Sequence, residues 1–302
     1  MNWFILSIIA MFCWSGSDFF SKLGCRDSKD KYSQFKMVMA VGLVMGVHAI
    51  YEIIKGVEIN WHVILTYLPV SLLYIGSMIL GYVGLRYIEL SISSPICNAS
   101  GAVVAIMSIL TGTSEMDNPL QYVAVALACL GVIGLGVVEA TEDKDLRAAR
   151  QKASNYKYAK SWLALALPIA YCMLDAAGTF ADAIVLENLN EDSANVAYEL
   201  TFFVAGIVCF VYTVLIKKQP LVATTERPKY IGALFETAGQ LAYIYALADT
   251  AHVAMAAPII ASYCMVSVLW SRLFLKEKLS WKHYLCIAVT FAGIVIMGVF
   301  DM

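Results

Sequence analysis

The feature that most constrains this chain is an internal repeat that relates its two halves. Residues 82–116 resemble residues 245–278 when Pro95 is placed over Pro258. The matched positions include Tyr82 with Tyr245, Ile96 with Ile259, and Val103 with Val266. In each copy one apolar helix is expected to end, a short turn follows, and a second apolar helix begins with a proline in its first turns. Because an internal repeat sets the architecture, the sequence predicts two copies of one unit.

The composition places this repeat in lipid. Of the 302 residues 60% are hydrophobic and only 15% are charged, whereas soluble domains carry about 25% charged residues. A membrane-spanning helix needs about 20 mostly apolar residues. Ten such runs are predicted, at residues 3–22, 36–54, 62–85, 90–111, 119–138, 161–186, 194–216, 229–248, 252–274 and 281–300.

A polar interval at 139–160 divides the ten runs into five and five. The predicted organisation is a first five-helix repeat at 1–140, a linker at 141–160 and a second repeat at 161–302. Since each repeat has an odd number of spans, the second copy enters the membrane from the opposite side. The predicted fold class is therefore an all-α integral membrane protein with ten transmembrane helices arranged as two inverted repeats, an architecture typical of secondary transporters.

Several other classes of function find no support in the sequence. The net charge is -2, most charges lie in predicted loops, and no basic tract with interleaved aromatic residues indicates a nucleic-acid partner. The eight cysteines are scattered without a CxxC pair, which argues against zinc and against a disulfide framework. No HExxH, GxSxG or GxGD motif is present, so we expect no enzymatic activity, no cofactor and no metal.

The basic residues predict an orientation. Twenty of the 21 lysines and arginines fall on one side of the predicted spans, and only Lys55 lies on the other. Since basic loops remain in the cytoplasm, this distribution places both termini outside it.

Features of both halves together resemble a known family. The first run carries Trp14, Gly16 and a closing Lys22, and Glu115 and Glu277 each precede a tyrosine-bearing helix with spaced glycines. With the two proline-containing hairpins, these features are similar to EamA-type members of the drug/metabolite transporter (DMT) superfamily. The resemblance implies a transporter of small metabolites whose first, third, fourth, sixth, eighth and ninth helices surround a central cavity. Members of the family usually keep both termini in the cytoplasm, contrary to the charge distribution here.

Charged residues inside the spans indicate where a substrate would bind. A charge at the centre of a bilayer costs about 2.5–3.5 kcal/mol on insertion scales, and Asp18, Asp175 and Glu236 lie deepest in their runs. Helical spacing places other polar side chains on the same faces as these acids. The predicted substrate-binding residues are Trp14, Asp18, Tyr74, Asn98, Asp175, Thr179, Glu236, Gln240, Tyr243 and Tyr263.

Structural roles compete with this interpretation. Asp18 could pair with Lys22 one turn later and serve only as a contact at the end of a helix. Asp182 and Asp249 are nearer the ends of their runs, so they are expected to reach the membrane interface. The glycines at 131, 134, 136, 293 and 298 are expected to permit close packing of the fifth and tenth helices.

Three residues are candidates for conformational change. Pro95 and Pro258 each remove a helical hydrogen bond within a predicted span, so they are predicted hinges. Glu199, in the seventh run, is assigned to gating rather than to binding.

The sequence thus predicts a secondary transporter of the plasma (inner) membrane. Carboxylates and aromatic rings around one cavity favour a cationic or zwitterionic cargo such as an amine, a quaternary ammonium compound or an amino acid. A buried carboxylate could exchange a proton for this cargo, which would couple transport to protons. A facilitator or exporter of a neutral or anionic metabolite, or a non-transporting scaffold or sensor, remains an alternative.

Overall fold

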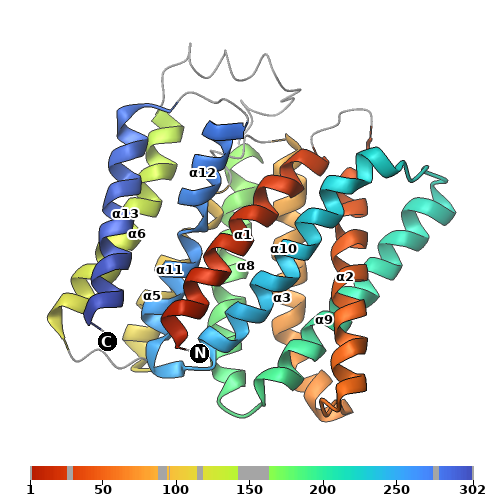
Figure 1. The fold of residues 1–302 in the computed structure, drawn as a ribbon, viewed down its shortest axis with the longest axis horizontal. Coiled ribbons are helices and arrows are strands. Elements are labelled where there is room, and N and C mark those ends of the chain that lie inside the picture. Colours follow the sequence, from red (N-terminus) through yellow and green to blue (C-terminus); the bar gives the residue numbers. More distant parts are fainter. Residues whose placement is uncertain are drawn as a thin grey trace.

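The computed structural model describes residues 2–25, 30–87, 94, 96–113, 118–141, 163–274 and 279–300. Within these ranges all regular elements are helices, and they pack side by side as a bundle (Figure 1). The longer elements are α1 (Trp3–Cys25), α2 (Ser33–Lys55), α3 (Trp61–Tyr87), α5 (Ser100–Thr111), α6 (Pro119–Thr141), α8 (Leu163–Leu186), α9 (Glu191–Phe210), α10 (Ala223–Leu247), α11 (Val253–Ala261), α12 (Tyr263–Phe274) and α13 (Trp281–Phe300). Two short elements complete them, the π-helix η1 (Val211–Ile216) and the 3-10 helix η2 (Thr250–His252).

The composition and length of these helices suit a membrane. In the described ranges, eight helical segments are long and apolar enough to cross one. Large apolar side chains point outward from the bundle, for example Leu65, Leu130 and Val208, which are 61%, 62% and 62% exposed. The predicted all-helical membrane architecture is thereby confirmed in its coarse form.

Individual spans differ from the prediction. The run predicted at 229–248 is α10, which starts at Ala223 and is not among the eight, because polar residues such as Glu236 and Gln240 keep even its second half less apolar than the other spans. The run predicted at 90–111 is described mainly as α5, which has only 12 residues. The predicted polar interval also begins too early, because α6 continues to Thr141.

The predicted run at 252–274 is an interrupted helix. Its two parts, α11 and α12, meet at Ser262. The Ser262 side chain and backbone N–H both donate to the Pro258 carbonyl, at 2.7 and 3.1 Å. Pro258 itself lies inside α11, so the interruption comes four residues after the proline.

The contacts between the two halves of the chain are symmetric: each helix of one half packs on the helix that its counterpart's partner would predict if the halves were interchanged. The first helix of each half packs on the third helix of the other, as α1 on α10 and α8 on α3. The second, fourth and fifth helices pack on their own counterparts, as α2 on α9, α5 on α11 and α6 on α13. In Figure 1, α1 rises from the lower end of the bundle, where both termini lie, whereas α8 descends towards that end.

Glycines allow some of these contacts to be very close. A Cβ atom on Gly42 of α2 would lie 2.5 Å from the Phe202 carbonyl oxygen and 2.9 Å from Gly206 Cα on α9. Gly131 and Gly293 permit the equivalent approach of α6 and α13, as predicted, whereas Gly298 packs against Phe4 of α1 instead.

Candidate functional site

A cavity of about 90 Å³ lies between helices of both halves. It is large enough to hold several water molecules. All ten predicted substrate-binding residues line it, namely Trp14, Asp18, Tyr74, Asn98, Asp175, Thr179, Glu236, Gln240, Tyr243 and Tyr263. The structure therefore brings together side chains that are up to 249 positions apart in the sequence.

Three carboxylates face this cavity, each from a different helix. Asp18 on α1, Asp175 on α8 and Glu236 on α10 are all partly accessible. A serine hydroxyl donates to each of them: Ser94 to Asp18 at 2.6 Å, Ser100 to Asp175 at 2.7 Å, and Ser17 to Glu236 at 2.6 Å. Ser267 adds a second, longer bond to Asp18, at 3.2 Å. A hydroxyl orients a carboxylate without neutralising it.

No lysine, arginine or histidine is among the described residues that line the cavity. The competing assignment of Asp18, an ion pair with Lys22, is not formed: no ion pair joins these two described side chains within 4.0 Å. Among the described lining residues, the hydrogen bonds to the three carboxylates thus come from neutral serine hydroxyls, and Lys22, one turn after Asp18, acts on Asp18 only through its electrostatic field. A cationic ligand would add the direct charge partner that these hydroxyls do not supply.

Aromatic rings form one wall of the cavity. The Trp14 ring lies 4.9 Å from that of Tyr243 and 5.9 Å from that of Tyr263, measured between centroids. The Tyr74 and Tyr243 hydroxyls contact each other where α3 meets α10. Rings next to carboxylates suit a cation with an apolar surface, because a ring face attracts positive charge.

Several buried polar atoms on the cavity wall lack a hydrogen-bond partner. Among the described residues, these unsatisfied atoms are Trp14 Nε1, Ser21 Oγ, Tyr82 OH and Gln240 Nε2. An unsatisfied buried donor costs about 1–3 kcal/mol, and such a cost is offset when a ligand or water accepts the bond. These unsatisfied atoms are a second indication, independent of the acids, that the cavity binds polar ligands or water.

Sequence reasoning missed part of the lining. Tyr82, Tyr171 and Tyr198 also face the cavity, as do Ser17, Ser94 and Ser100, which bond to the carboxylates. Tyr171 lies four residues before Asp175, so helical spacing could have placed it on the same face.

The other predicted acids lie away from the cavity. Asp182 does not reach the interface as predicted: it is fully buried, because α3 packs on α8 and its Tyr67 and Tyr74 cover the carboxylate. Asp249 is partly exposed and pairs with His252 at 2.7 Å. Glu199 is buried and binds His48 on α2, with 2.9 Å between the imidazole Nδ1 and each carboxylate oxygen.

The two predicted hinges have different status. Pro258 lies in α11 beside Ala257, which lines the cavity. Pro95 lies outside the described residues.

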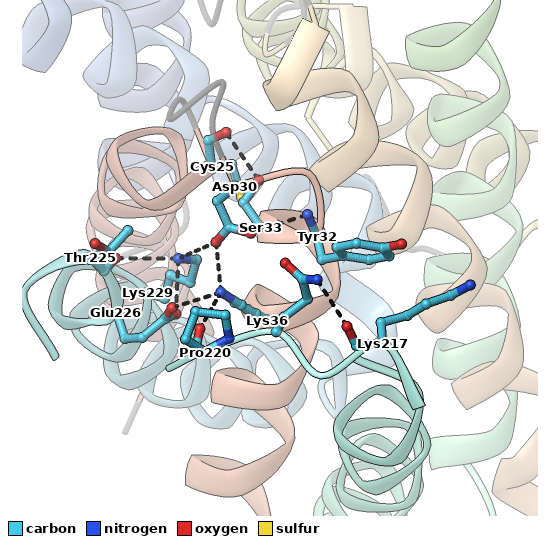
Figure 2. A network of polar contacts seen from close by, with 11 residues as sticks. Cys25, Asp30, Tyr32, Ser33, Lys36, Lys217, Pro220, Thr225, Glu226 and Lys229 are labelled. Atoms are coloured by element: carbon cyan, nitrogen blue, oxygen red, sulfur yellow. Dashed lines mark hydrogen bonds and ion pairs between the residues drawn. The ribbon is translucent and has the colours of Figure 1, made fainter. Parts of the chain in front are cut away.

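Four charges that we expected in solvated loops are buried together at one end of the bundle. Figure 2 shows Asp30, Lys36, Glu226 and Lys229, here called the charge quartet, converging between the starts of α2 and α10. Lys36 Nζ lies 3.0 Å from Asp30 and 3.4 Å from Glu226, and Lys229 Nζ lies 2.9 Å from Glu226 and 3.8 Å from Asp30. The two positive and two negative charges of these four side chains therefore cancel within one network.

No group of three or more His, Cys, Asp or Glu side chains that could hold a metal ion is found among the described residues. None of the eight cysteines, which all lie in the described ranges, forms a disulfide bond.

Comparisons with known proteins agree with this geometry. The sequence profile described as the EamA-like transporter family matches residues 1–137 and 162–299. No curated protein matches. Twenty-eight chains of solved structures do. One of them, described only as "Crystal structure of protein", is 12% identical, covers 99% of this chain and 96% of its own, and superposes with a TM-score of 0.65, which is a likeness of fold. With the family profile matching nearly the whole chain and eight helices able to span a bilayer, the protein is an integral multi-pass membrane protein that belongs to the EamA-like transporter family.

Proposed function

We propose that this chain is a secondary transporter that moves a small cationic or zwitterionic metabolite, such as an amine, a quaternary ammonium compound or an amino acid, across the plasma (inner) membrane. The observation that carries the proposal is the cavity with three carboxylates and, among its described lining residues, no basic side chain. In a medium of low dielectric a carboxylate attracts a cation strongly and disfavours an anion.

The proposal includes ten transmembrane helices in two inverted repeats that work by alternating access. The symmetric contacts between the halves and the opposite directions of α1 and α8 in Figure 1 support it. A central site between two such repeats can face either side in turn. We assign hinge roles to Pro95 and Pro258 and a gating role to Glu199 in this motion.

Proton coupling belongs to the same proposal. A carboxylate that binds either a proton or a cationic cargo, but not both, links the two fluxes. A neutral or anionic cargo would gain nothing from Asp18, Asp175 and Glu236, and a scaffold or sensor would have no use for a polar cavity shared by both halves.

Uptake into proteoliposomes tests the proposal. Purified protein would be assayed with radiolabelled tetramethylammonium, arginine and phosphate under an imposed pH gradient. We expect uptake of a cationic probe. Glu236→Gln and Asp175→Asn should each reduce this uptake by ~10-fold or more, because each removes one close pair between a carboxylate and the cation. Asp249→Asn, the same change at a partly exposed acid outside the cavity, should leave uptake unchanged. Uptake of phosphate alone, or of no probe, would contradict the cationic assignment.

A further inference from the structure

Two fully buried acids lie outside the cavity among the described residues, and only one of them, Glu199, is paired with a histidine. Asp182 has no exposed surface and lies two helical turns beyond Asp175 on the same face of α8. A carboxylate with no access to the cavity cannot be a contact for the cargo, so another role is needed for it.

Tyrosine hydroxyls surround this carboxyl group. Tyr67 donates to Asp182 Oδ1 at 2.7 Å, and the Tyr74 hydroxyl lies 3.4 Å from Oδ2. Two further titratable groups lie close by: Tyr198 of α9, which packs on α3 and meets the rings of Tyr67 and Tyr74 edge-on, and Tyr243 of α10, which packs on α8. On η2, His252 is paired with Asp249 and stacked on Trp3. No ion pair to Asp182 is formed by a described lysine, arginine or histidine.

The hydroxyl of Tyr74 connects Asp182 to the cavity. It contacts three oxygens besides its own: Asp182 Oδ2, Thr179 Oγ1 at 3.2 Å, and the Tyr243 hydroxyl. A phenol has only one hydrogen to donate, so these neighbours compete for it and the chain of bonds can be rearranged. Tyr74, Tyr243 and Thr179 all line the cavity, whereas Tyr67 extends the chain from Asp182 towards the opposite end of α3.

We propose that Asp182 is a proton-binding site, connected to the cavity by a relay through Tyr74 and Tyr243. An isolated buried charge is costly, whereas a carboxylic acid bonded to hydroxyls is not, and a proton needs a hydrogen-bonded path rather than open space. When a cation enters the cavity, the O–H bond of the acid breaks and its proton passes to the Tyr74 oxygen. The hydrogen of Tyr74 passes to Tyr243, and that of Tyr243 to a water molecule in the cavity, which carries it away as hydronium. Each phenol ends with one hydrogen, and Asp182 is left as a carboxylate whose charge balances the cation.

The coupling of this proton to cargo movement rests on the proposed function. Proton binding by Asp182 does not, so it can be tested without any cargo. Infrared difference spectra of the full chain in liposomes, recorded between acidic and alkaline buffer, report the carbonyl stretch of protonated carboxylic acids. We expect Asp182→Asn to remove one such band, and Tyr67→Phe and Tyr74→Phe to shift it. Tyr245→Phe is the matched control, because Tyr245 also binds a carboxylate, that of Asp192, but outside the cavity. Should Asp182→Asn fail to fold, the two tyrosine variants still decide the point.

Proton flux tests the relay. A pH-sensitive dye trapped in the liposomes would record proton movement driven by a gradient of tetramethylammonium. Asp182→Asn and Tyr74→Phe are expected to slow this flux ~10-fold or more, as expected for the loss of a positioned proton carrier, and Tyr245→Phe to leave it unchanged. Binding of the probe, followed by the fluorescence of Trp14 at the cavity wall, should survive in Asp182→Asn but not in Asp175→Asn.

Different failures have different meanings. An unchanged acid band in Asp182→Asn, or proton flux at the parental rate, would overturn the relay. A loss of probe binding in Asp182→Asn as large as in Asp175→Asn would make Asp182 part of the cargo site instead. If the parent protein neither binds nor moves any cation, the proposed function fails, while the infrared result still decides whether Asp182 holds a proton.

Discussion

The Ser17 hydroxyl on α1 donates a hydrogen bond of 2.6 Å to Glu236 on α10, across 219 positions of the sequence. This bond joins the first helix of one half to the third helix of the other at the wall of the cavity. The bond orients the Glu236 carboxylate and leaves its negative charge available to a bound ligand.

Removal of this bond should cost stability. A hydrogen bond to a charged group contributes about 1.5–3 kcal/mol, so we expect Ser17→Ala to lower the free energy of unfolding by about this amount. The measurement is equilibrium unfolding in mixed detergent micelles. Ser108→Ala is the control, because its buried hydroxyl has no partner among the described residues, so its removal should not lower the free energy of unfolding. Equal effects of the two changes would mean that the bond to Glu236 adds nothing.

The stability of the protein should depend strongly on whether each charge of the quartet keeps a partner. Removing one partner of a buried ion pair typically costs 3–5 kcal/mol because the remaining charge is stranded, and Lys229 is fully buried. Lys229→Met should therefore destabilise the protein by about that amount, and the double change Lys229→Met with Glu226→Gln by much less. Lys55→Met, which removes the exposed partner of Glu52, should cost about 0–1 kcal/mol. Thermal unfolding in detergent would compare the four proteins.

Replacing Gln240 by an apolar residue should make the protein more stable and weaken its binding of a cation. Its Nε2 is buried at the cavity wall without a partner among the described residues. Replacing an unsatisfied donor by an apolar group of similar size removes a desolvation cost of about 1–3 kcal/mol, so Gln240→Met should unfold at a higher temperature than the parent. It should also bind tetramethylammonium or arginine more weakly, as judged by calorimetry. Ser271→Ala, at another buried unpartnered hydroxyl, should share the stabilisation without the loss of binding.

The contact between Gly42 and Gly206 predicts that side-chain size is critical there. Because a Cβ atom on Gly42 would lie 2.5 Å from the Phe202 carbonyl oxygen, Gly42→Leu must push α2 away from α9. Overpacking of this kind costs about 1–3 kcal/mol or more, which should appear as lower yield of folded protein and a lower unfolding temperature. Gly76→Ala is the control, since its new Cβ would lie 3.5 Å from Leu174 in ordinary contact. A fully stable Gly42→Leu protein would contradict the close approach of the two backbones.

The basic residues predict the orientation in the membrane. With 20 of 21 lysines and arginines on one side, we expect both termini outside the cytoplasm. Alkaline phosphatase fused after Met302 should be active, and green fluorescent protein at the same site should be dark. The opposite pattern would place the termini in the cytoplasm, as in other members of the family.

Much of the cavity could be predicted from the sequence because helical spacing is a local property. Asp175 with Thr179, and Glu236 with Gln240 and Tyr243, share helix faces whatever surrounds them. All of them line the cavity. The spacing could not reveal that serines would hold the acids, because a serine in a membrane helix commonly bonds to its own backbone, as Ser7 does to the Trp3 carbonyl.

Depth in the bundle was harder to predict than helix face. We expected Asp182 at the interface because it is close to the end of its run, and α8 does end at Leu186, but Tyr67 and Tyr74 of α3 cover the carboxylate and bury it. Similarly, Lys36 and Lys229 looked like loop charges until the fold brought Glu226 to Lys36 and Asp30 to Lys229. In both cases burial depends on a neighbour that is distant in the sequence.

The charge quartet also bears on how the protein is made. Its first half contributes Asp30 and Lys36 and its second half Glu226 and Lys229, so each half carries one acid and one base of its own. The two quartet side chains of each half can therefore pair before the halves meet, and docking adds cross-pairs without stranding either charge. We expect that the chain, cut between residues 141 and 163 and produced as two polypeptides, reassembles in the bilayer.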